Sequence, residues 1–278
     1  MKFMKRLLCA TLACVSVFGS VAMMTACETN KPEVEMTLSF NGKEYTVTYE
    51  MNRKLTPSTI THFLELVDGG YYDGVCIHDY SESKWYTGGY EMKNGSLEYL
   101  PYYERLAEKN IELTPTVWFD GEATGTVYGE FSANNFSVEK GSVKNSFGAL
   151  TMYYTSKGSD DTRVQVKLSS GGEAIKNYAY NSATSLFYIN MNASASAVSA
   201  YCTFATLKEK SVETLEDLQA AVADYITANY SDEDGENEFA PEVEVATNVD
   251  DMIVGQSSAQ YKVPEEAIVI TSMKVTKW

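Results

Sequence analysis

Histidine is scarce in this sequence, and its cysteines do not cluster. The 278 residues include two histidines, His62 and His78, and five cysteines without a CxxC pair. Structural zinc sites need cysteine and histidine at short, fixed spacings, so the sequence predicts no metal site. The phosphate-binding patterns GxGxxG, GKS and GKT and the hydrolase pattern GxSxG are absent as well. We therefore expect no cofactor and no serine nucleophile.

Positive charge is also in short supply. Lysine and arginine number 22 against 38 aspartates and glutamates, which gives a formal charge of −16. Lys2, Lys5 and Arg6 carry three of the positive charges, so the chain after residue 26 bears −19. Nucleic-acid binding needs a basic footprint, and adhesion to anionic lipid needs a basic patch. The composition therefore argues against both kinds of partner.

The N-terminus resembles a bacterial lipoprotein signal. Three basic residues precede an apolar run, 7–22, which is too short and too rich in small residues for a membrane span. The run leads to Ala26 and Cys27, a small residue before a cysteine. We expect residues 1–26 to be a signal peptide, Cys27 to be lipidated and 27–33 to be a polar tether. The chain would then be anchored at the extracytoplasmic face of a bacterial cell membrane. The alternative is an ordinary secretory signal, with Cys27 incidental.

Two cysteines remain after such processing, Cys76 and Cys202. Both lie in apolar, strand-like runs. We expect buried free thiols, and a single disulfide between them is the alternative that spacing leaves open.

Alternating polarity predicts strands at both ends of the mature chain. Residues 34–40 and 44–51 alternate on either side of Asn41-Gly42, a strong signal for a tight hairpin turn. Residues 267–275 alternate in the same way and predict a closing strand.

Two segments have the spacing of amphipathic helices. The first is expected to be capped by Thr56, to hold Pro57 in its first turn and to end at Gly69-Gly70. The second spans 212–230. The first helix carries its apolar stripe at i, i+3, i+4 and i+7: Ile60, Phe63, Leu64 and Val67.

After the first helix, Tyr71-Tyr72-Asp73-Gly74 forms an aromatic turn before a short apolar strand that ends at His78. This order of helix, aromatic turn and strand resembles the cyclophilins, a family of peptidyl-prolyl cis-trans isomerases. Further matches are the glycine pair 88–89, GEATGTVYGEF at 121–131, GALTMYY at 148–154 and SATSLFYI at 182–189. The resemblance covers about residue 39 to the C-terminus, apart from 91–120, which we interpret as an insertion.

The resemblance implies a mainly β fold. We expect one domain at 34–278, a closed eight-stranded antiparallel barrel capped by two helices, with the insertion above it. It also implies a groove that binds proline-containing peptides. The residues at the matching positions are His78, Met152, Phe187, Tyr188, Tyr201 and Phe204.

The donors of the family's active site are replaced here. Asp79 stands in place of the catalytic arginine, and Thr87 and Leu186 stand in place of two glutamines. Rotation about a peptide bond crosses a barrier of about 18–20 kcal/mol, which a positioned donor lowers by binding the twisted amide. An ionised aspartate only accepts hydrogen bonds. Arg53 or Lys84 would have to reach the site to restore a cation.

We therefore expect a cyclophilin-like surface lipoprotein that acts on proline-containing segments of exported proteins, with weak or lost catalysis. Its partners would be such peptides or exported proteins, the membrane would be reached only through the lipid, and the protein would be a monomer. Two alternatives remain. One is a non-catalytic module on the same fold that binds peptides or a partner protein. The other is an unrelated β-rich lipoprotein that mimics the pattern.

Overall fold

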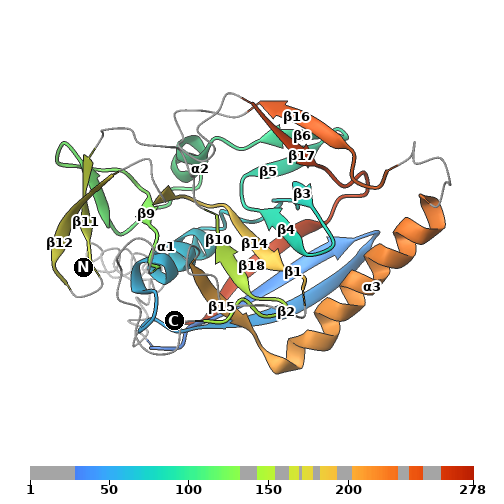
Figure 1. The fold of residues 1–278 in the computed structure, drawn as a ribbon, viewed down its shortest axis with the longest axis horizontal. Helices are drawn as coiled ribbons and strands as arrows, with labels where there is room; N and C mark the ends of the chain where they lie inside the picture. The colour runs from blue at the N-terminus through green and yellow to red at the C-terminus, as the bar shows by residue number, and fades with distance from the viewer. Residues whose placement is uncertain are drawn as a thin grey trace, which may run out of the picture.

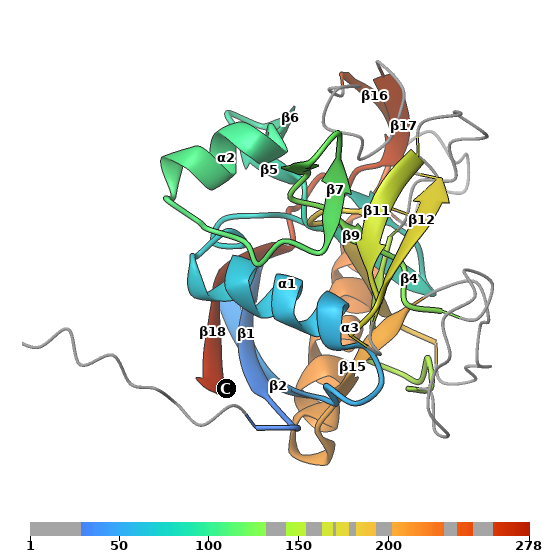
Figure 2. The same cartoon turned by 90° about the vertical axis from the view of Figure 1, so that its left-hand side faces the viewer.

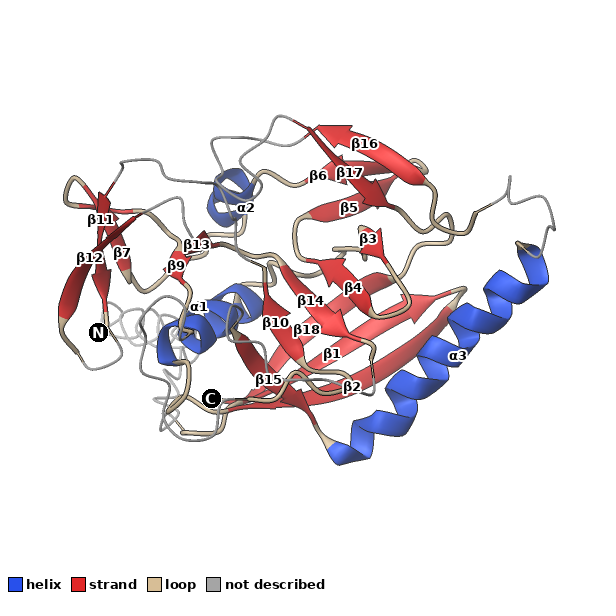
Figure 3. Ribbon diagram, viewed as in Figure 1, coloured by secondary structure: helices blue, strands red, loops and turns tan. Residues whose placement is uncertain are grey.

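A computed structural model describes most of the chain after the N-terminal region. The described residues are 29–131, 143–153, 163–168, 171–177, 182–192, 202–230, 238–246 and 258–278. Strands dominate, and three α-helices accompany them in these ranges (Figures 1 and 3). The predicted mainly β fold is thus confirmed.

The central feature is a strongly curled antiparallel sheet of eight strands. Its hydrogen-bonded order is β18-β1-β2-β15-β10-β14-β4-β3. In that order the strands are Val269–Lys277, Glu33–Phe40, Lys43–Met51, Thr203–Leu207, Leu150–Met152, Phe187–Asn190, Lys84–Thr87 and Asp79–Tyr80. The predicted opening hairpin is β1–β2, and the predicted closing strand is β18.

The expectation of a closed barrel is wrong. No ladder joins the edge strands β3 and β18, so the sheet is a half-barrel. The segment before β3 approaches β18 through one isolated bridge, Cys76 to Val269, and through bonds such as Ile77 N–H to the Ile268 carbonyl, 2.8 Å. In the same segment the N–H groups of Cys76 and His78 point to the other side and donate to the carbonyls of Tyr90 and Tyr86, both at 2.9 Å. Asp79 and Tyr80 of β3 pair with β4, so the contact with β18 ends before β3 begins.

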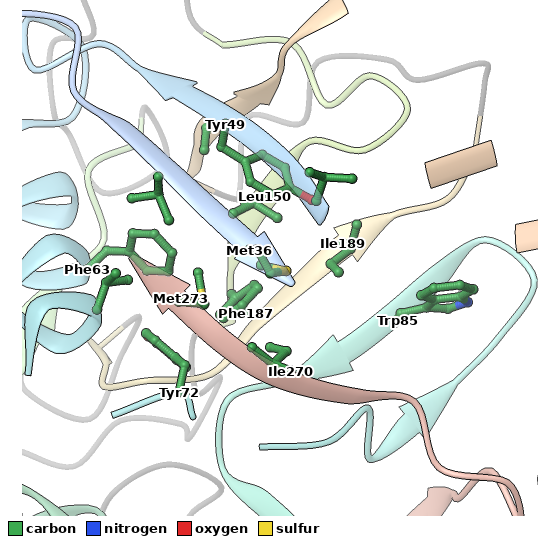
Figure 4. Packing of buried hydrophobic residues seen from close by; sticks show 14 of the residues in the cluster. Met36, Tyr49, Phe63, Tyr72, Trp85, Leu150, Phe187, Ile189, Ile270 and Met273 are labelled. Atoms are coloured by element: carbon green, nitrogen blue, oxygen red, sulfur yellow. The ribbon is translucent and has the colours of Figure 1, made fainter. Parts of the chain in front are cut away.

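Local backbone geometry explains the first hairpin. Asn41 and Gly42 both have positive φ, 46° and 74°, as the two central residues of a type I′ turn require. Alternate residues of β1 are fully buried, and the hydrophobic core fills the concave side of the curled sheet. Figure 4 shows Met36, Leu150, Phe187, Ile189 and Ile270 from four different strands meeting there.

The two predicted helices lie on opposite sides of the half-barrel (Figures 1 and 2). They are α1, Pro57–Asp68, which contacts β18, and α3, Val212–Asn229, which packs along β2 after a 3-10 turn at Glu209–Ser211. No helix in the described part of the chain is long and apolar enough to cross a membrane.

The predicted cap of α1 is wrong. The Thr56 side chain makes no cap hydrogen bond, and its buried hydroxyl has no partner. The carboxylate of Glu130 takes its place, accepting the backbone N–H groups of Ser58 at 3.2 Å and Thr59 at 2.8 Å. Pro57 is in the first turn as predicted.

Smaller sheets surround the half-barrel. One has four strands in the order β12-β11-β7-β8, namely Glu173–Asn177, Arg163–Lys167, Val117–Phe119 and Glu122–Ala123. Three are two-stranded: β5–β6, Tyr90–Lys93 with Ser96–Tyr99; β9–β13, Val127–Tyr128 with Ser182–Ala183; and β16–β17, Glu242–Ala246 with Ser258–Lys262.

A third helix, α2, Tyr102–Glu108, lies within the segment interpreted as an insertion. Its Arg105 is 9% exposed and fixes α2 to the aromatic turn after α1. The guanidinium donates Nε to the carbonyl of Tyr71 at 2.8 Å and an Nη2 hydrogen to the carbonyl of Asp73 at 2.9 Å. That 91–120 is an insertion stays a prediction.

Candidate functional site

Asp79, which the sequence resemblance matches to an arginine, is held by the neighbouring hairpin β16–β17. It starts the edge strand β3 and is paired with Tyr86 of β4. Its Oδ1 accepts the backbone N–H of Lys262, in β17, at 3.1 Å. Partial burial raises the pKa of Asp79, and the charge of Glu242 adds to the rise, while the bond from Lys262 and its charge oppose it. The ionised carboxylate of Asp79 can only accept hydrogen bonds, and it already accepts one from Lys262.

His78 is buried beside the same hairpin. It is 3% exposed, and its ring lies 4.5 Å from that of Tyr90 and 4.9 Å from that of Tyr261. Its Nδ1 is buried without a hydrogen-bond partner. Burial lowers the pKa of His78 to about 3, so the ring is neutral at pH 7. This geometry is that of an aromatic core residue rather than a proton donor facing a ligand.

Neither residue at the two glutamine positions can hold a peptide by its side chain. The Thr87 hydroxyl is fully buried and donates to the carbonyl of Cys76 at 2.8 Å. Leu186 is 3% exposed and has no polar atom in its side chain. The glycine pair next to Thr87 has a local cause, since a Cβ on Gly88 would lie 2.2 Å from the carbonyl oxygen of Ser185.

Three of the expected groove residues belong to the core of the half-barrel. Met152, Phe187 and Phe204 have no exposed surface. The Phe63 ring of α1 lies 5.6 Å from Phe187 and 4.7 Å from Phe204, and Figure 4 shows Phe63 and Phe187 within the same cluster. In the described arrangement these side chains stabilise the fold and offer no surface to a peptide.

Tyr188 lies on the opposite face of the sheet. It is paired with Tyr86, whose ring is 5.3 Å away, and the Lys84 ammonium lies 5.0 Å from the Tyr188 ring centre. Asn145 donates to the Tyr188 hydroxyl at 3.3 Å. The structure therefore does not bring the predicted groove residues together. Met152, Phe187 and Phe204 lie in the core, His78 lies beneath the hairpin β16–β17, and Tyr188 lies on the opposite, outer face of the sheet. Tyr201 and Cys27 lie outside the described residues.

Sequence reasoning missed a row of tyrosines on that outer face. Tyr153, 36% exposed, meets Tyr86 edge to face at 5.9 Å, and Tyr86 in turn meets Tyr188. Asp79 is paired with Tyr86, so the row runs from the arginine position across the sheet. Alternation was the available signal, because residues 84, 86 and 188 take the face opposite to 85 and 187. Tyr188 itself is only 2% exposed and packs behind Tyr86, so the surface that a peptide can reach is formed by Tyr153 and the half-buried Tyr86.

The two cations considered as replacements have other contacts. Arg53 donates to the hydroxyl of Thr61 on α1 at 3.0 Å. Lys84 lies over the Tyr188 ring as described. Cys76 and Cys202 are both buried and are not joined by a disulfide, as the sequence predicted. Among the described residues, no three histidine, cysteine or acidic side chains lie where they could hold a metal ion.

Comparison with known proteins identifies the family. Residues 34–247 match the family model described as "Cyclophilin type peptidyl-prolyl cis-trans isomerase/CLD". This match covers more than half of the chain, and the protein therefore belongs to the cyclophilin-type peptidyl-prolyl isomerase family. No curated protein sequence matches the chain.

Similar solved structures include two of a Cryptosporidium parvum cyclophilin type peptidyl-prolyl cis-trans isomerase. The one in the presence of the dipeptide Ala-Pro shares 15% identity at a TM-score of 0.45, over 88% of this chain and 99% of that chain. The other shares 16% identity at a TM-score of 0.43, over 89% and 99%.

Proposed function

We propose that this protein is a cyclophilin-type lipoprotein that binds proline-containing segments of exported proteins and isomerises them weakly or not at all. The observation that carries the proposal is Asp79, a carboxylate at the arginine position that already accepts a backbone N–H from Lys262. Family membership supports the choice of ligand, and Tyr86 and Tyr153, backed by the buried Tyr188, supply an aromatic face beside Asp79.

The chemistry of the barrier favours binding over turnover. A twisted prolyl amide regains a lone pair on nitrogen, and a donor that binds this region lowers the barrier. Asp79 cannot donate when ionised, Thr87 donates to a backbone carbonyl, and Leu186 has no donor. Loss of one positioned donor costs about 2.7–4 kcal/mol in comparable sites, which is about a hundredfold to a thousandfold in rate.

Export and anchoring rest on the sequence around Cys27. Basic residues, a short apolar run and a small residue before cysteine support lipidation of Cys27 and placement at the extracytoplasmic face of a bacterial membrane. Incorporation of labelled fatty acid into the wild-type chain, and none into Cys27→Ser, is the expected result. A water-soluble, unlabelled wild-type protein would contradict the lipoprotein proposal.

The activity is tested with residues 28–278, which contain every described element. We expect a labelled Ala-Ala-Pro-Phe peptide to bind, Ala-Ala-Ala-Phe to bind more weakly, and prolyl isomerisation to stay near the uncatalysed rate. Tyr86→Ala should weaken binding, since Tyr86 is the half-buried centre of the tyrosine row. A rate well above background would refute the loss of catalysis. Equal binding of the two peptides would favour a general protein-binding module.

A further inference from the structure

The hairpin β16–β17 lies over the start of β3, where Asp79 follows His78. Its strand β17 lies against β3, and its strand β16 lies against β6 of the neighbouring hairpin (Figure 1). It forms a two-stranded sheet of its own, with Glu242 to Ala246 paired to Lys262 to Ser258. Within the described residues no backbone ladder joins the hairpin to the neighbouring strands, so side-chain contacts and individual hydrogen bonds attach it to them.

Two adjacent residues of β17 make the contacts to the site. Lys262 gives its backbone N–H to Asp79 at 3.1 Å. Tyr261 places its ring 4.9 Å from His78 and 5.2 Å from Tyr90, and the two tyrosine hydroxyls lie 3.3 Å apart. These contacts account for the burial of His78 and for the partial burial of Asp79.

The attachment of the hairpin is weak compared with that of the main sheet. Val245 is its one buried residue within the described strands, and it packs with Cys76 and Tyr90. A pocket of about 640 Å³ lies beside the contact between β16 and β6, lined by Met92, Leu97, Val243 and their neighbours. Isolated two-stranded hairpins are marginally stable in water, and segments with few buried apolar contacts open at low free-energy cost.

We propose that β16–β17 is a built-in cover for the Asp79 end of the tyrosine row, held by Lys262 and Tyr261, and that its release exposes His78 and Asp79 to a bound peptide. This proposal rests on the proposed function, because it concerns access to the same site. In the covered arrangement a peptide reaches the tyrosine row but not the strand end.

The hairpin can be released without breaking its own ladder. Val263 donates its N–H to the carbonyl of Pro241 at 3.1 Å, so alternation directs the N–H of Lys262 away from β16 and toward Asp79. Lys262→Pro therefore removes the bond to Asp79 while sparing the ladder, and Tyr261→Ala removes the ring contacts. The control is Gln260→Ala, an exposed residue of the same strand.

The first measurement is hydrogen exchange in residues 28–278. Loss of a hydrogen bond to a charged group corresponds to about tenfold or more in an opening equilibrium. We expect the β17 amides of the double variant Tyr261→Ala/Lys262→Pro to exchange at least about tenfold faster, with those of β1 and β2 unchanged. Gln260→Ala should match the wild type. Unchanged exchange in the double variant would overturn the proposal.

The second measurement is the affinity for the labelled Ala-Ala-Pro-Phe peptide. We expect the double variant to bind about tenfold more tightly than the wild type and than Gln260→Ala. Equal affinity with faster exchange would overturn the cover and leave the proposed function standing. Absence of binding in every protein, with exchange raised in the double variant, would overturn the proposed function and the cover with it.

Discussion

Replacement of Glu130 tests whether helix α1 depends on an acceptor supplied from far along the chain. The carboxylate is 3% exposed and accepts two N–H groups in the first turn, from Ser58 and Thr59. Glu130→Ala leaves a buried N–H of Thr59 and a partly buried N–H of Ser58 without a partner. An unsatisfied buried donor costs about 1–3 kcal/mol, and the lost Cγ methylene adds about 0.8 kcal/mol.

The expected loss in Glu130→Ala is therefore about 2–4 kcal/mol in the free energy of unfolding. Glu130→Gln is the matched variant, because it keeps one acceptor oxygen and nearly the same volume. It should lose less stability than Glu130→Ala, because it leaves only one of the two N–H groups without an acceptor. Urea titrations at pH 7 on residues 28–278 measure both values.

The pH dependence separates charge from hydrogen bonding at this residue. Burial raises the pKa of Glu130 above its ordinary value of 4.5. The folded state then keeps a proton that the unfolded chain has lost, so wild-type stability falls as the pH rises from 4.5 through the raised pKa. Glutamine does not titrate, so the free energy of unfolding of Glu130→Gln should rise relative to that of the wild type over the same pH range. A glutamine variant as damaged as the alanine variant would refute the argument, because the charge itself would then be essential.

Three further predictions concern the backbone, a histidine and the thiols. Gly88→Ala should lower stability far more than Gly42→Ala in urea titrations, since both have positive φ but only at Gly88 would a Cβ meet a carbonyl oxygen, at 2.2 Å. Burial lowers the pKa of His78 to about 3, so the unfolded chain binds a proton below pH 6.5 that the folded protein does not bind. The free energy of unfolding of the wild type should therefore fall by about 2 kcal/mol between pH 7 and pH 5 through this residue, and His78→Phe should remove that part of the loss. Burial raises the pKa of the Cys76 thiol to about 12, and alkylation followed by mass spectrometry should label Cys76 and Cys202 only after unfolding. The histidine argument fails if the stability difference between the wild type and His78→Phe does not change with pH. The glycine argument fails if the two alanine variants lose the same stability, and the thiol argument fails if the native protein is labelled rapidly.

Local sequence patterns were sufficient to predict the secondary-structure elements that are determined by residues close together in the chain. The hairpin β1–β2 follows from Asn41-Gly42, and α1 follows from its apolar stripe and its terminal glycines. The cap of α1 could not be predicted in this way, because its partner, Glu130, is 71 residues from Thr59. A threonine before a helix is a good local candidate, but the tertiary structure supplies a stronger acceptor.

The site was harder to predict because it depends on which face of the sheet each side chain takes and on which distant segments pack over that face. Phe187 and Tyr188 were both assigned to the groove, although adjacent strand residues point to opposite faces. Pairing then places Phe187 in the core and Tyr188 beside Tyr86. The hairpin β16–β17 was not predicted at all. Val243 and Val245 alternate with acids, but residues 247–257 separate the two strands, so no short turn marks the hairpin.

The guanidinium of Arg105 has a consequence for any attempt to shorten this protein. Segment 91–120 does not merely rest on the half-barrel, since Arg105 binds the carbonyls of Tyr71 and Asp73 and lies 5.3 Å from the centre of the Tyr71 ring. Excision of the segment would strip two carbonyl groups of their donors and uncover an aromatic ring. A trimmed chain would then need new partners for the turn after α1 before it could fold as the parent does.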